Sequence, residues 1–129
     1  PVSRAVVYVL DAETGDKIWD FAAPPYNKPI AGTGWDNICC PDVFGSPTIG
    51  ADGTVYVNWS GGYSYGLRDS NRNGRINPHD KFEVTSHHHG SGTNGNTAIA
   101  PGLVVVPSCH RLLAYTGQGR AMGHLRVVK

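Results

Sequence analysis

The stretch Arg4-Ala-Val-Val-Tyr8-Val-Leu10-Asp11-Ala-Glu-Thr14-Gly15-Asp-Lys-Ile-Trp19 joins an apolar run to a polar, glycine-containing turn. Valine and tyrosine dominate the apolar run, and these residues favour β-strands over helices. The same order of strand and turn recurs twice further along the chain. The sequence therefore predicts a fold built from repeated β units.

The two later units are Ser46 to Asp69 and Asn96 to Gly117. Asp52-Gly53 in one and Pro101-Gly102 in the other separate an opening strand from a second strand rich in valine, which indicates a hairpin. A further strand follows in each unit, so each is predicted to be a short antiparallel meander. We expect one all-β domain over residues 1–129, with blade-like units at about 1–24, 44–85 and 95–118.

The segment Leu10-Asp11-Ala-Glu-Thr14-Gly15-Asp-Lys-Ile-Trp19 resembles the blade repeat of the quinoprotein-type, eight-bladed β-propellers. The resemblance implies that Asp11 and Thr14 fix the turn and that Trp19 docks between adjacent blades. The later units lack a tryptophan at the docking position. A chain of 129 residues supplies only two to three blades. The remainder of a longer polypeptide, or other protein chains, would then complete the propeller and cover its edges.

A polar segment, Asp69-Ser-Asn71-Arg-Asn73-Gly74-Arg75-Ile76-Asn77-Pro-His-Asp80, has the ligand spacing of a calcium loop, with glycine at its sixth position. A hard divalent cation takes six to eight oxygens, and alternate residues of a tight loop supply them. Ile76 is expected to point away from the ion into apolar surroundings. The predicted calcium ligands are the side chains of Asp69, Asn71, Asn73, Asn77 and Asp80 and the backbone carbonyl of Arg75.

The residues on either side of this calcium-type loop are not typical of helices, which argues against an EF-hand sensor. Asp80 replaces the usual glutamate, and in this the loop resembles those of dockerin modules. Because only Asp69 and Asp80 are charged ligands, we expect a Kd on the order of 0.1 to 1 mM. Asp69 stands where Asp11 stands in the first unit, so the loop is predicted to be an insertion that binds structural calcium. The alternative is an Asx-rich turn without metal.

Cys39 and Cys40 resemble the adjacent cysteines that line the quinone in quinone-dependent (PQQ) alcohol dehydrogenases. A fragment of such an oxidoreductase is therefore one alternative for the function. Buried reduced thiols, or a bridge to Cys109, are the other interpretations of these residues.

Other polar and aromatic groups each have two interpretations. Of the three histidines His87 to His89, at most the first and third lie on one strand face and share a metal, and solvated loop histidines are the alternative. Asn58-Trp59-Ser60 is an acceptor triplet for N-glycosylation. Carbohydrate binding by an extracellular module is one interpretation of the aromatic residues, and packing between blades is the other; they are Trp35, Tyr56, Trp59, Tyr63 and Tyr65.

The chain carries 11 basic and 10 acidic residues, and no basic stripe indicates a nucleic-acid partner. No apolar run is long enough to span a bilayer, and acidic residues such as Glu83 stand at predicted turns. Neither a Ser-His-Asp motif nor a phosphate-binding loop is present, which disfavours an enzyme. The start without Met suggests a processed product or a piece of a longer chain. We expect a non-catalytic, calcium-binding scaffold or interaction module in a secreted, periplasmic or organelle-lumen setting.

Overall fold

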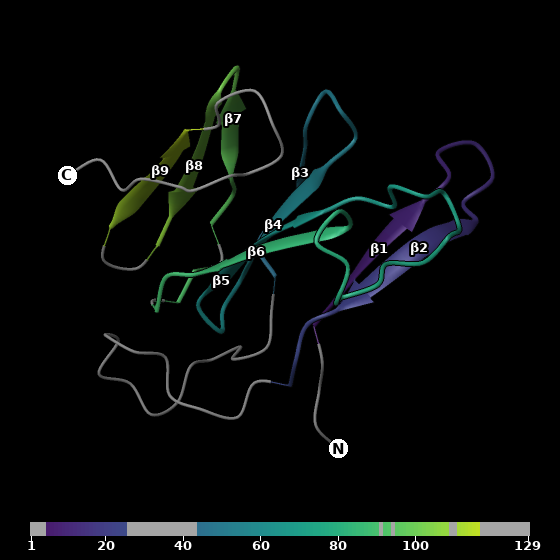
Figure 1. Ribbon diagram of the computed structural model, residues 1–129, viewed down its shortest axis with the longest axis horizontal. Coiled ribbons are helices and arrows are strands. Elements are labelled where there is room, and N and C mark those ends of the chain that lie inside the picture. The colour runs from purple at the N-terminus through teal and green to yellow at the C-terminus, as the bar shows by residue number, and fades with distance from the viewer. Residues whose placement is uncertain (1–4, 26–43, 91, 94, 109–110, 117–129) are drawn as a thin grey trace.

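The computed structural model describes residues 5–25, 44–90, 92–93, 95–108 and 111–116, and within these ranges all regular structure is β-strand (Figure 1). The strands form three antiparallel sheets that follow one another along the chain. The prediction of an all-β, antiparallel architecture is therefore confirmed at this level.

The first sheet contains β1 (Val6–Leu10) and β2 (Lys17–Ala22). The pairing runs from Val6 opposite Ala22 to Leu10 opposite Lys17, with an irregularity after Val9. Asp11 follows β1 directly, and its Oδ1 accepts hydrogen bonds from the backbone N–H groups of Glu13 and Thr14, both at 2.9 Å. The side chain of Asp11 therefore stabilises the turn between β1 and β2.

The second sheet has the order β3-β4-β5-β6. Its strands are β3 (Thr48–Ile49), β4 (Val55–Trp59), β5 (Tyr63–Leu67) and β6 (Val84–His88). Gly53 has a φ of 82°, a backbone conformation that glycine adopts without steric cost, and it closes the predicted hairpin between β3 and β4. The sheet continues to His88, past the predicted end of this unit at residue 85.

The third sheet contains β7 (Ala98–Ala100), β8 (Leu103–Pro107) and β9 (Leu112–Thr116). Gly102, with a φ of 73°, lies in the turn between β7 and β8, which confirms the hairpin predicted at Pro101-Gly102. The three strands form a meander in chain order.

The first two sheets pack face to face through an apolar core. Trp19 is only 5% exposed and lies in this core with aliphatic and aromatic side chains of both sheets. Burial of each such side chain stabilises the fold by roughly 1.5–3 kcal/mol. The core contains Val7, Trp19, Phe21, Val55, Val57, Trp59, Tyr65 and Leu67, among others.

The opposite face of the second sheet lies against the third sheet. Thr48 Oγ1 donates a 2.7 Å hydrogen bond to the carbonyl of Thr97, and the His87 and Tyr115 rings meet edge to face at 5.4 Å between centroids. The second sheet therefore packs against the first sheet on one face and against the third on the other.

Candidate metal loop and buried polar row

The candidate calcium loop connects β5 to β6 and runs beside β2 of the first sheet (Figure 1). The backbone N–H of Arg68 donates to the carbonyl of Glu83 at 2.9 Å and closes the loop at its base. Gly74 has a φ of 76°, and a Cβ added there would lie 3.3 Å from the carbonyl oxygen of Ile18 in β2. Ile76 packs against the core between the first two sheets, as predicted. The loop is thus docked on the first sheet.

The first half of the loop folds around the oxygens of three predicted ligands. Asp69 accepts hydrogen bonds from the backbone N–H of Asn73 at 3.1 Å and of Gly74 at 2.8 Å. Asn71 Oδ1 accepts a second bond from the N–H of Asn73 at 3.0 Å, and Asn73 Oδ1 accepts one from the N–H of Arg75 at 2.9 Å. Each oxygen keeps further lone pairs. Asp69, Asn71 and Asn73 are therefore brought together.

The second half of the loop holds the other two predicted side-chain ligands in local turns. Asn77 Oδ1 accepts a hydrogen bond from the N–H of His79 at 3.0 Å, and Asp80 Oδ1 accepts one from the N–H of Phe82 at 2.8 Å. The Asp80 carbonyl also accepts bonds from the N–H groups of Glu83 and Val84. These bonds lead the chain into β6.

Glu83 connects the two halves and was not among the predicted site residues. It is 1% exposed, its Oε1 accepts a 2.6 Å hydrogen bond from Asn71 Nδ2, and its Oε2 accepts a 2.8 Å bond from the backbone N–H of Asn77. The sequence marks Glu83 only as an acidic residue at a turn. Its position immediately before a strand was the available signal that it faces inward.

The donor chemistry of the loop suits a hard cation. Within the described ranges, no group of three or more His, Cys, Asp or Glu side chains is placed to hold a metal. The loop instead offers two aspartates and three asparagine amides, and amide and carboxylate oxygens are ligands that Ca²⁺ accepts. The donor types of the loop are therefore those of a hard-cation site and not those of a histidine or cysteine site.

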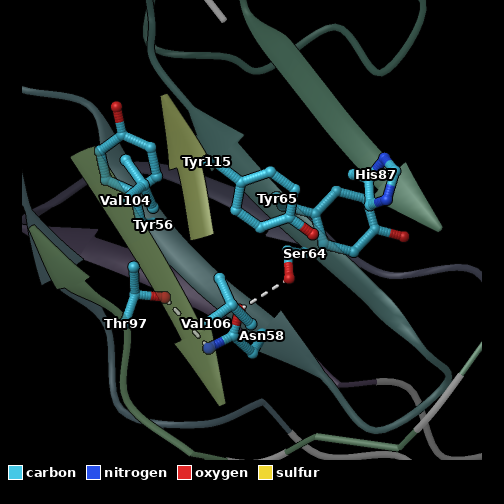
Figure 2. A pocket seen from close by; sticks show the side chains of 9 residues that line it. All are labelled: Tyr56, Asn58, Ser64, Tyr65, His87, Thr97, Val104, Val106 and Tyr115. Atoms are coloured by element: carbon cyan, nitrogen blue, oxygen red, sulfur yellow. Dashed lines mark hydrogen bonds between the residues drawn. The ribbon is translucent and has the colours of Figure 1, made fainter. Parts of the chain in front are cut away.

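A row of polar side chains crosses the second sheet on the face toward the third. Asn58, Ser64 and His87 stand opposite one another on β4, β5 and β6. Asn58 is 1% exposed, and its Nδ2 donates to the Gly95 carbonyl at 2.7 Å and to Thr97 Oγ1 at 3.0 Å. Ser64 Oγ donates to Asn58 Oδ1 at 2.9 Å (Figure 2). The bonds of Asn58 therefore join the second sheet to the segment that leads into β7 of the third.

A small cavity of about 20 Å³ lies beside this row (Figure 2). Tyr115 lines it, and burial raises the pKa of the Tyr115 phenol to about 12. A cavity of this size has room for about one water molecule and is too small for a cofactor. The polar row therefore serves packing between sheets.

His87 and His88 point to opposite faces of the sheet, as strand geometry predicts. The His87 ring faces Tyr115 toward the third sheet, whereas the His88 ring packs on Tyr63 with centroids 4.5 Å apart on the other face. His87 and His88 are therefore not placed to share one metal ion, and a metal shared by His87 and His89 stays a prediction.

The packing of the fold bears on two further hypotheses from the sequence, which are glycosylation of Asn58 and an aromatic platform for carbohydrate. The Asn58 amide nitrogen is buried and hydrogen-bonded, so a glycan on it would require the contact with Thr97 to open. Trp59 and Tyr65 are buried in the core and present no open aromatic platform. Cys39, Cys40, Cys109 and Trp35 lie outside the described residues.

Comparison of the sequence with protein-family models finds no matching family, and comparison with curated proteins finds no matching relative. The described part of the chain also contains no helix of a length and apolarity that would cross a membrane.

Proposed function

We propose that this chain is a non-catalytic, calcium-stabilised segment of a β-propeller that acts as a structural scaffold in a non-cytosolic compartment. The observation that carries the proposal is the loop from Asp69 to Asp80, whose first half folds around oxygens of Asp69, Asn71 and Asn73. A loop already shaped around oxygens loses less conformational entropy when it binds an ion.

Docking of the loop gives the calcium a structural consequence. Gly74 approaches the backbone of β2, and Ile76 is partly buried against the core between the first two sheets. An ion that binds only the folded loop stabilises everything that must be ordered for the loop to form. Calcium is therefore expected to stabilise the contact between the first and second sheets as well as the loop.

The scaffold role is supported by the way the sheets follow one another. The second sheet is covered on both faces, and the third has an outer face of apolar side chains, including Leu112 at 64% exposure. The strand register places on that outer face seven apolar residues and one threonine: Ala98, Ala100, Leu103, Val105, Pro107, Leu112, Ala114 and Thr116. An uncharged face of this kind suits a further sheet packed as the first three are, whether from a longer polypeptide or from another chain.

The test is thermal unfolding with and without calcium. At calcium about twentyfold above Kd, linkage adds about 2 kcal/mol to the free energy of unfolding. For a chain of this size we expect the Tm to rise by roughly 6–10 °C. Magnesium at the same concentration is the control, because its smaller ion demands a tighter octahedral shell. An identical Tm in calcium and in chelator would contradict the proposal.

A further inference from the structure

We infer that Glu83 is a positioning residue of the calcium loop: it holds the Asn71 amide with its oxygen facing the loop. This inference rests on the proposed function. It concerns a residue outside the span from Asp69 to Asp80 that the ligand spacing defines.

The carboxylate of Glu83 accepts hydrogen bonds from two nitrogen atoms of the loop. Oε1 takes its hydrogen bond from Asn71 Nδ2 and Oε2 from the backbone N–H of Asn77, so one carboxylate reaches both halves of the loop. Asn71 and Asn77 stand at the third and ninth ligand positions. Glu83 therefore fixes the separation of two predicted ligands.

Hydrogen-bond chemistry sets the direction of the Asn71 amide. An ionised carboxylate only accepts, so the group facing Glu83 must be the NH₂ branch of the amide. The Oδ1 atom then points away from Glu83, and it accepts from the N–H of Asn73 inside the loop. Without the carboxylate, only the Asn73 N–H would oppose the flipped form of the amide, in which nitrogen would face the ion.

The charge of Glu83 gives the second line of argument. The side chain is 1% exposed, and the ion pairs among the described residues are Lys17–Asp20 and Arg68–Asp52, neither of which includes Glu83. Two hydrogen bonds offset part of the cost of burying a carboxylate, and a nearby cation would offset more. A cation bound through Asn71 Oδ1 would lie on the far side of the amide that Glu83 holds.

The principal test is Glu83→Gln, which keeps the size of the side chain but turns one acceptor oxygen into a donor. We expect the calcium Kd, measured by calorimetric titration, to rise about tenfold, as when an outer-shell partner of a metal ligand is lost. We also expect the calcium-induced rise in Tm to shrink. Asp11→Asn is the matched control, because it removes a carboxylate from the other aspartate turn and should leave the calcium Kd unchanged.

A second pair of variants keeps the inference testable if Glu83→Gln folds poorly. Asn71→Asp adds a charged ligand, which alone would tighten calcium binding. Here we expect weaker binding, because the new carboxylate would face that of Glu83. The double variant Asn71→Asp/Glu83→Gln restores a donor opposite an acceptor and the original total charge, so its Kd should return toward that of the unmodified chain.

The outcomes separate the inference from the proposed function. If the unmodified chain binds calcium and Glu83→Gln binds it equally well, with the Tm lowered by the same amount in calcium and in chelator, Glu83 is merely structural and the inference is overturned. Tighter binding by Asn71→Asp alone would overturn it as well. If the unmodified chain binds no calcium, both the proposed function and the inference fail.

Discussion

Two turns in this protein begin with an aspartate close behind a strand, directly after β1 in one case and one residue after β5 in the other, yet they end differently. After β1, Asp11 caps a short turn whose backbone is closed by bonds from Gly15 N–H to the Asp11 carbonyl and from Asp11 N–H to the Asp16 carbonyl. After β5, Asp69 caps a long loop that is closed by Arg68 and Glu83 and docked on β2.

The two turns differ in how many side-chain oxygens accept hydrogen bonds from the backbone. In the short turn one carboxylate holds two N–H groups, and these bonds lower the pKa of Asp11, the bond from Thr14 most and that from Glu13 next. In the long loop, side-chain oxygens of Asp69, Asn71 and Asn73 accept hydrogen bonds from one stretch of backbone. The carboxylate of Glu83 is buried next to this loop. The short turn satisfies its own acceptors, whereas we propose that the oxygens of the long loop also bind a cation.

The largest effect is expected from Asp69→Ala. It removes two backbone hydrogen bonds and a charged ligand, so in saturating calcium the free energy of unfolding should fall by about 3 kcal/mol. In chelator the loss should be about half as large. Thermal melting in calcium and in chelator measures the two losses of unfolding free energy. Equal losses would mean that Asp69, like Asp11, only stabilises a turn.

A smaller effect separates the glycines of the two turns. Gly74 and Gly15 have nearly equal φ values, 76° and 77°, but a Cβ at Gly74 would approach the Ile18 carbonyl, whereas at Gly15 it would meet open space. We expect Gly15→Ala to cost about 1 kcal/mol of backbone strain and Gly74→Ala about 2 kcal/mol, because docking on β2 is disturbed as well. Denaturant unfolding compares them, and equal losses would contradict the docking.

The short turn should show acid sensitivity without calcium dependence. Because the pKa of Asp11 is lowered in the fold, its contribution is present above the unfolded pKa of about 3.8 and is lost as the pH falls through the folded value. Asp11→Asn keeps an acceptor oxygen, so the part of the acid loss due to residue 11 should disappear. Melting curves between pH 5 and pH 2 test this; the same acid profile in both proteins would be the contrary result.

The smallest effect is expected at Arg72, which has a φ of 58° in the long loop. Glycine adopts this conformation without strain, although it also has more freedom in the unfolded chain. Arg72→Gly should therefore raise the free energy of unfolding by roughly 0.5 kcal/mol. Chemical denaturation detects a change of this size, and a clear loss of stability would mean that the arginine side chain makes a contact worth more than the strain.

Local signals predicted much of the fold. Asp52-Gly53 and Pro101-Gly102 identified their hairpins because the adjacent residues themselves determine whether a tight turn forms. The alternation of His87 and His88 followed from strand geometry.

Contacts between distant residues were not predictable in the same way. The bond from Asn58 to Thr97 depends on how two sheets stack, and local sequence does not specify that. Glu83 was missed for a related reason: its partner Asn71 lies across a loop whose path is set by docking on β2. The acceptor triplet at Asn58 likewise gave no sign of the burial of that residue.

The central claim, that the loop from Asp69 to Asp80 binds structural calcium, is tested most directly by following backbone amide resonances during a calcium titration. We predict saturable shifts with a Kd on the order of 0.1 to 1 mM, largest at Asn73 and Gly74 and present at Ile18 in β2, with the turn after Asp11 unchanged. Resonances of the loop that stay in place up to 10 mM calcium would contradict the account.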